Sequence, residues 1–174
     1  MKRAALLLAL ALALLVAVLF ARALPRGTEV SAPPPAAGLR IDTQAVARRL
    51  SEVIRIPTIT DDQPGADSQQ FAQLRTLLER EYPRVHAALP REIIAGHSLL
   101  FTWAGSEPAL PPMLLMGHMD VVPVVAGSET DWTYPPFSGA LANGEVWGRG
   151  ALDDKQHVIA LLDAAELLLA EGLR

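Results

Sequence analysis

The sequence predicts a layered α/β domain preceded by an N-terminal hydrophobic helix. Two observations carry this prediction. A run of eighteen apolar residues spans 4–21, and helical and strand-like patterns alternate from Ile41 onward. The length of 174 residues fits one domain of ordinary size.

The apolar run forms a helix of about 27 Å, which nearly spans the hydrocarbon core of a membrane. We favour an uncleaved signal anchor over residues 1–23, because the run is long and Arg22 and Arg26 flank it. A cleaved signal peptide is the alternative, with Ala21-Arg22-Ala23 as its small-x-small site. The body is exported in both cases: it is membrane-anchored in the first, and secreted or periplasmic in the second.

The composition of the rest of the chain limits the classes of function that the protein can have. Residues 24–40 are rich in proline and predict a linker, so the folded body comprises 41–174. Four of the 15 basic residues lie in the first 26, which leaves an acidic body without a basic run longer than two and argues against a nucleic-acid partner. With no cysteine in the chain, any metal site must use histidine and carboxylates.

Local patterns predict the elements of the body. Two amphipathic helices are expected first, one capped by Asp42 or Thr43 and ending before Pro57, the next over 68–82 with Pro83 as its stop. The apolar run Met113–Met116 predicts a buried strand. The other expected elements are strands at 92–95 and 98–103, a hairpin at Asn143-Gly144 and a final helix over 154–171.

The chemistry-bearing residues follow two of these elements. His118 and Asp120 come directly after the run 113–116, and strand alternation places them on one side, where the carboxylate can orient the imidazole of a metal ligand. A self-satisfied His-Asp pair is the alternative. Asp153 and Asp154 lie at the start of the final helix, where capping explains one carboxylate and a divalent metal explains a pair.

Two neighbours of the acidic pair have less certain uses. His157 lies four residues after Asp153 and would chelate the same ion if both lay on one helical turn, but we favour an exposed helical histidine. The role of Lys155 stays open between moderating the two carboxylates and simple solvation.

The stretches Gly117–Pro123 and Gly148–Lys155 together resemble the two metal motifs of the family M20 zinc metallopeptidases, which include aminoacylase, glutamate carboxypeptidase and succinyl-diaminopimelate desuccinylase. The loop from Trp132 to Gly144 also resembles the sequences of this family, particularly those of the branch that contains carboxypeptidase S and the N-fatty-acyl-amino-acid hydrolases. The resemblance implies a three-layer α/β/α zinc-exopeptidase-like catalytic domain. This chain would hold only its N-terminal part.

The resemblance also implies the chemistry. His118 would ligate one of two zinc ions, Asp153 would bridge both, and Asp120 would orient His118 as a catalytic residue. Asp154 would be the motif's second aspartate without being a ligand. The substrate would be a peptide or an N-acyl amino acid whose amide bond is cleaved by metal-activated water, and a full-length form would be a homodimer.

The family's glutamate base, its later carboxylate ligand and its final histidine would follow Arg174. Glu166 and Glu171 are expected on the solvated face of the final helix, and neither is expected to act as the base. We therefore expect this 174-residue chain to be inactive as an enzyme. The alternative function is a non-catalytic fragment with at most partial metal binding.

Overall fold

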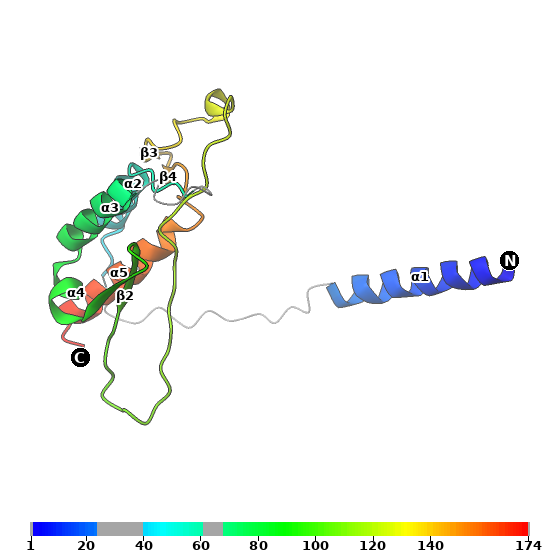
Figure 1. The fold of residues 1–174 in the computed structure, drawn as a ribbon, viewed down its shortest axis with the longest axis horizontal. Helices are drawn as coiled ribbons and strands as arrows, with labels where there is room; N and C mark the ends of the chain where they lie inside the picture. The colour runs from blue at the N-terminus through cyan, green and yellow to red at the C-terminus, as the bar shows by residue number, and fades with distance from the viewer. Residues whose placement is uncertain (1, 24–39, 61–67, 174) are drawn as a thin grey trace. The chain divides into compact units, whose positions relative to one another are not determined.

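The computed structural model describes residues 2–23, 40–60 and 68–173, which divide into units of residues 1–40 and 41–174 (Figure 1). All of the predicted linker except Arg40 lies outside the described residues. The elements are α1 (Lys2–Ala23), α2 (Thr43–Ile54), α3 (Ser68–Glu81), α4 (Pro83–Ala88), β1 (Arg91–Ile94), β2 (Ser98–Phe101), η1 (Glu129–Asp131), β3 (Ala140–Ala142), β4 (Glu145–Trp147) and α5 (Lys155–Ala170).

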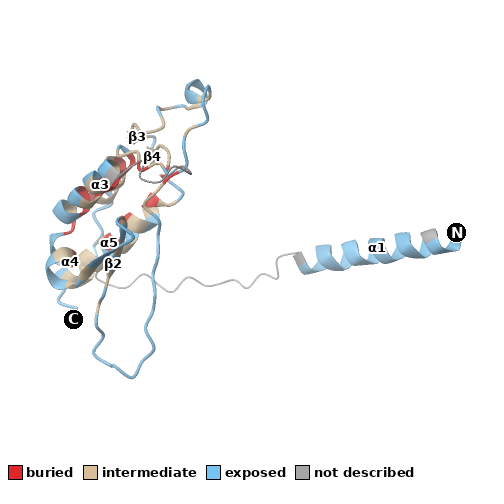
Figure 2. Ribbon diagram, in the orientation of Figure 1, coloured by how far each residue is buried: buried red, intermediate tan, exposed pale blue. Residues whose placement is uncertain are grey.

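Helix α1 and Arg40 are the described parts of the first unit. The described side chains of α1 are exposed, as Figure 2 shows in pale blue. By length and composition, the segment Lys2–Arg22 is able to cross a membrane. The predicted N-terminal hydrophobic helix is therefore present, and signal sequences and membrane anchors share this property.

Helix α2 forms where the sequence predicted it. The side chain of Asp42 accepts a hydrogen bond of 3.0 Å from the backbone N–H of Ala45, which satisfies one of the free amides of the first turn. Val53 and Ile54 are buried at the other end of the helix. The cap and the apolar spacing together fix its bounds.

Helix α4 was not predicted. Pro83 does end α3, but it also begins α4, because proline has no amide hydrogen to lose in a first helical turn. The amides of Arg84 and Val85 donate to the carboxylate of Glu166, at 3.2 and 3.0 Å. The expectation that Glu166 lies on a solvated face is therefore wrong, since its carboxylate caps α4.

The apolar core lies where α2, α3, α4 and α5 face one another. Figure 2 shows the buried residues in red along these helices. Complete burial of one large aliphatic side chain contributes about 1.5–3 kcal/mol, so this cluster supplies much of the stability of the second unit. It consists of Val53, Leu74, Leu77, Leu78, Tyr82, Val85, Ile159 and Leu162.

The predicted hairpin at Asn143-Gly144 is present, and the two predicted strands that precede it also pair as a hairpin. In the hairpin that comes first along the chain, β1 pairs antiparallel with β2, and Arg91 stands opposite Phe101. In the second, β3 pairs with β4 across Asn143 and Gly144, whose φ angles of 56° and 78° suit a two-residue turn of the type that follows strand twist.

The prediction of a buried strand at Met113–Met116 is wrong for this structure. Met113 is 81% exposed and Leu115 is 61% exposed. A strand needs a neighbour for its amides and carbonyls, and among the described residues β1 pairs only with β2 and β3 only with β4. The mixed helix and strand content agrees with an α/β domain, while the three-layer arrangement stays a prediction.

We predict that Leu78→Ala lowers the free energy of unfolding by about 2–5 kcal/mol, because it opens a cavity among α2, α3 and α5. Chemical denaturation followed by circular dichroism measures the change. Leu110→Ala is the matched control, because Leu110 is 68% exposed and its truncation should change stability by less than about 0.5 kcal/mol. Equal stability of the two variants would contradict the assigned core.

Candidate metal centre

The three predicted site residues lie together. Nε2 of His118 is 2.9 Å from Oδ1 of Asp153, although 35 residues separate them in sequence. Nδ1 of His118 is 3.3 Å from Oδ1 of Asp120 and 3.1 Å from its backbone oxygen. Each imidazole nitrogen therefore faces oxygen atoms.

The pair His118 and Asp153 is open to solvent. The side chain of His118 is 48% exposed and that of Asp153 is 89% exposed. The pKa of His118 is raised above its ordinary value, chiefly by the hydrogen bond with Asp153, while burial opposes this shift. The arrangement presents one nitrogen and one carboxylate oxygen toward a common point that a small molecule or ion can reach.

Asp154 holds the polypeptide around this pair. Its Oδ2 accepts a hydrogen bond of 3.1 Å from the backbone N–H of His118, and its Oδ1 contacts Nδ1 of His157. The contact with His157 lowers the pKa of Asp154. Asp154 occupies the N-cap position of α5 without a side-chain capping bond, and the Asp153-Asp154 peptide bond is cis.

These contacts bear on the predicted roles of Asp154 and His157. Capping of α5 does not account for Asp154, because its oxygens bind His118 and His157 instead of the helix amides. His157 is 62% exposed and pairs with Asp154, as expected of an exposed helical histidine. Chelation of one ion by Asp153 and His157 has no support in this geometry.

Lys155 has the most informative environment near the site. Its side chain is fully buried, and its Nζ donates to the carbonyl oxygens of Val53 at 3.0 Å and Ile56 at 2.6 Å. Burial lowers the pKa of Lys155 to about 8, and the charge of Asp120 opposes this shift. Lys155 therefore connects the first turn of α5 to the end of α2.

A short backbone pairing places the segment after α2 beside the site. Ile59 and Val121 form a parallel bridge. Gly150 lies against it with a φ of 84°, and a Cβ at Gly150 would approach Cγ1 of Val121 to 2.6 Å. Glycine meets both the conformational and the spatial requirement at this position.

The residues fit part of a zinc site. Imidazole nitrogen and carboxylate oxygen are zinc ligands, and a backbone or carboxylate oxygen at the other ring nitrogen is the usual support of a ligating histidine. Within residues 2–23, 40–60 and 68–173, no group of three or more histidine, cysteine and acidic side chains is placed to hold one ion. The pair would supply two of the four donors that a zinc ion takes.

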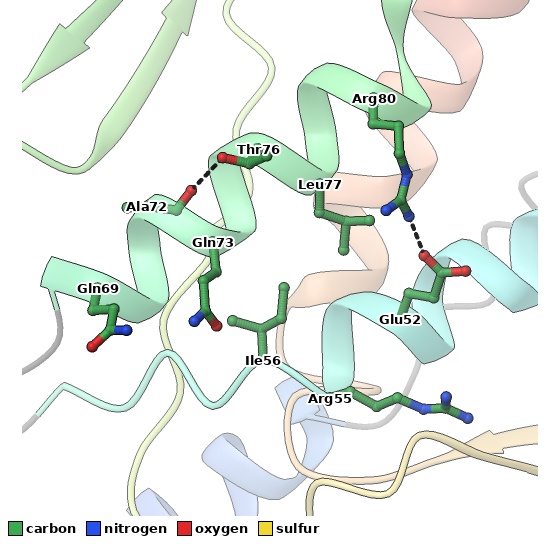
Figure 3. Close-up of a pocket in the computed structure, with 9 residues that line it drawn as sticks. All are labelled: Glu52, Arg55, Ile56, Gln69, Ala72, Gln73, Thr76, Leu77 and Arg80. Carbon is green, nitrogen blue, oxygen red and sulfur yellow. Dashed lines mark hydrogen bonds and ion pairs between the residues drawn. The ribbon is translucent and has the colours of Figure 1, made fainter.

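A groove of about 560 Å³ lies elsewhere, between α2 and α3, and shares no residue with the pair (Figure 3). An ion pair of 2.6 Å between Arg80 and Glu52 closes one end. Its lining is mixed in character and consists of Glu52, Arg55, Ile56, Gln69, Ala72, Gln73, Thr76, Leu77 and Arg80.

Sequence reasoning missed Thr60. Its hydroxyl donates a hydrogen bond of 2.7 Å to Oδ2 of Asp120, across sixty residues of sequence. A threonine in a polar stretch carries no local signal of such a contact. The contact between Thr60 and Asp120 depends on the pairing of Ile59 with Val121, which is seen only in the structure.

Comparison with known proteins identifies relatives. Residues 114–174 match peptidase family M20/M25/M40. Carboxypeptidase S of Saccharomyces cerevisiae is 40% identical over 134 residues, which cover 72% of this chain and 23% of that protein. N-fatty-acyl-amino acid synthase/hydrolase PM20D1 of Mus musculus is 42% identical over 127 residues, covering 72% of this chain and 25% of that protein.

A third relative agrees with these two. Probable carboxypeptidase S-like 2 of Dictyostelium discoideum is 38% identical over 132 residues, covering 74% of this chain and 25% of that protein. The chain thus spans about a quarter of the length of these curated relatives. The resemblance inferred from the two motifs is confirmed.

We predict that Lys155→Met lowers the free energy of unfolding by about 1–3 kcal/mol, because the buried carbonyls of Val53 and Ile56 lose their donor. Urea denaturation measures the loss. Gln156→Met is the control on the same helical turn, since the Gln156 side chain bonds only the nearby carbonyl of Leu152. A Lys155→Met chain as stable as the control would show that the buried ammonium does not hold the two segments together.

Proposed function

We propose that this chain carries part of the metal centre of a zinc-dependent hydrolase, because residues 114–174 match peptidase family M20/M25/M40. In this proposal His118 and Asp153 would hold zinc, and Asp120 would orient the ring of His118. The observation that carries it is the distance of 2.9 Å between Nε2 of His118 and Oδ1 of Asp153, two donors that converge from separate motifs. We further propose that 41–174 contributes to a three-layer α/β/α catalytic domain.

The residues of this chain would have separate tasks in the reaction. A bound zinc ion polarises a carbonyl and lowers the pKa of water at its site. His118 and Asp153 would hold the ion. The backbone oxygen of Asp120 lies 3.1 Å from Nδ1 of His118 and its Oδ1 lies 3.3 Å away, so a proton held on Nδ1 would leave the lone pair of Nε2 for the metal. Asp154 fixes the backbone of His118.

We propose that the general base is not among the glutamates of α5 and its end. Both carboxylate oxygens of Glu166 accept hydrogen bonds from the backbone amides of α4. Glu171 is exposed at the C-cap of α5. The glutamate base that the family resemblance implies is therefore assigned to neither residue.

The names of the relatives support a substrate class. We propose that the complete site cleaves the amide bond of a peptide or an N-acyl amino acid. The similarity to carboxypeptidase S and to an N-fatty-acyl-amino acid synthase/hydrolase supports this class. The exposure of His118 and Asp153 is compatible with a substrate that approaches from solvent.

We propose that α1 exports the body, as an uncleaved anchor in preference to a cleaved signal. Support comes from a segment, Lys2–Arg22, that is long and apolar enough to cross a membrane. Residues 41–174 would then lie outside the cytoplasm, attached to the membrane through α1.

One observation favours a second function for the 174-residue chain itself, namely partial metal binding without turnover. The described residues bring two zinc ligands together, and no third histidine or carboxylate joins them. Hydrolysis of an N-acyl amino acid by the chain separates the two functions. Turnover supports the complete hydrolase, and zinc binding without turnover supports the second function.

We predict that zinc titration of the full chain in detergent detects binding that His118→Ala weakens at least about tenfold, because one of two donors is lost. Calorimetry measures the dissociation constant. His97→Ala is the matched control, because the ring of His97 packs on Phe71 at 4.7 Å, away from the pair. Equal effects of the two substitutions would remove His118 from the site.

The fate of α1 is tested by the mass of the exported protein. An uncleaved anchor leaves the mass of the complete chain and keeps it in the membrane fraction after a carbonate wash. Cleavage after Ala23 removes the segment and releases the body. Recovery of only the shorter mass would overturn the anchor.

A further inference from the structure

Asp120 is held from two sides. Its Oδ2 accepts a hydrogen bond of 2.7 Å from the hydroxyl of Thr60, while its Oδ1 lies 3.3 Å from Nδ1 of His118. A carboxylate bonded at one oxygen loses rotational freedom about its terminal bond. The Thr60 hydroxyl therefore determines which way the second oxygen points.

Backbone pairing fixes the position of Thr60. Its amide donates to the carbonyl of Val121 at 3.1 Å, and the amide of Val121 donates to the carbonyl of Thr58 at 2.9 Å. The Thr58 hydroxyl donates to the carbonyl of Met119 at 2.5 Å. These bonds flank Asp120 on both sides, so its contact with Thr60 follows from the register of two paired segments.

The pairing is itself anchored in the core. The buried ammonium of Lys155 donates a hydrogen bond to the carbonyl oxygen of Ile56, four residues before Thr60. Thr58 is completely buried. Thr60 is exposed, but it directly follows the segment Ile56–Ile59, which contains the buried Thr58 and is held by hydrogen bonds.

We propose that Thr60 is a positioning residue of the metal centre, acting through Asp120 on His118, an inference that rests on the proposed zinc function. In the described residues, the hydrogen bond of the Thr60 hydroxyl goes to Asp120 and not to His118 or Asp153. This hydroxyl restrains the Asp120 carboxylate, whose Oδ1 lies 3.3 Å from Nδ1 of His118, beside the Asp120 backbone oxygen that pairs with this nitrogen at 3.1 Å. This restraint fixes the ring and directs Nε2 toward Asp153. Partners that contact a ligating histidine directly change metal affinity by about 10–100-fold, and a residue one contact further out should change it by roughly 3–10-fold.

Zinc titration of the full chain tests the inference. Thr60→Val keeps the shape of the side chain, removes the hydroxyl and should weaken zinc binding by roughly 3–10-fold. Thr60→Ser keeps the hydroxyl and should bind as the unsubstituted chain does. Thr76→Val is the matched control, because its hydroxyl bonds only the carbonyl of Ala72 within α3. Equal zinc affinity of Thr60→Val and Thr76→Val would overturn the inference.

A double-mutant cycle shows whether Thr60 acts through Asp120. In an Asp120→Ala background, Thr60→Val should cause no further loss of zinc affinity, because the acceptor of its hydroxyl is gone. The ring ¹⁵N shifts of His118 in the zinc-loaded chain should change in either single variant and no further in the double variant. Additive losses would indicate a general effect on the fold and would refute the positioning role.

The outcomes separate this inference from the proposed function. Zinc binding that depends on His118 and ignores Thr60→Val overturns the positioning role alone. Zinc binding that His118→Ala leaves unchanged overturns both. A loss with Thr60→Val that Thr60→Ser restores, and that vanishes without the Asp120 carboxylate, supports both.

Discussion

A buried ammonium group organises the second unit. The Lys155 side chain donates to two carbonyls near the C-terminal end of α2, about a hundred residues earlier in the chain. Burial of an ammonium is costly unless it is hydrogen-bonded, and the end of a helix carries the partial negative charge that favours a cation. No carboxylate contacts its Nζ in the described residues, so backbone oxygen atoms stabilise the charge. Packing of α2 against α5 and the position of the site both depend on this connection.

From this connection the geometry extends in two directions. Toward the N-terminal side of α5, the chain places Asp153 and Asp154 around His118. Beyond α2, it places the bridge between Ile59 and Val121 next to Asp120. The candidate site thus forms from the two short segments that adjoin the buried Lys155 contact. Its side chains are exposed to solvent, but the backbone next to them is buried.

Local signals predicted much of the fold. The Asp42 cap and the Asn143-Gly144 turn act within a few residues, so sequence alone was enough to place α2 and the second hairpin. Long-range contacts were not accessible in this way. The helical continuation at Pro83 depends on Glu166, which lies more than eighty residues away. Apolar composition at 113–116 indicated burial, but burial depends on a covering surface that no described segment provides. The two sequence motifs predicted that His118 and Asp153 belong to one site, and these side chains lie 2.9 Å apart in the structure. The hydrogen bond between Thr60 and Asp120 could be found only from the structure.

The consecutive residues Asp153, Asp154 and Lys155 face three different surroundings: the solvent-exposed imidazole, the backbone of His118 and the buried end of α2. This arrangement makes the segment intolerant of insertions and deletions in a way that single substitutions are not. Counted from Gly150, a one-residue insertion before Asp153 would bring Asp154 to the buried position of Lys155, and a one-residue deletion would bring Gln156 there. Either change would also misalign Asp153 and Asp154 with His118. The exposed stretch around Leu110 faces no such constraint, so length variation among related genes should accumulate there and be rare at the start of α5.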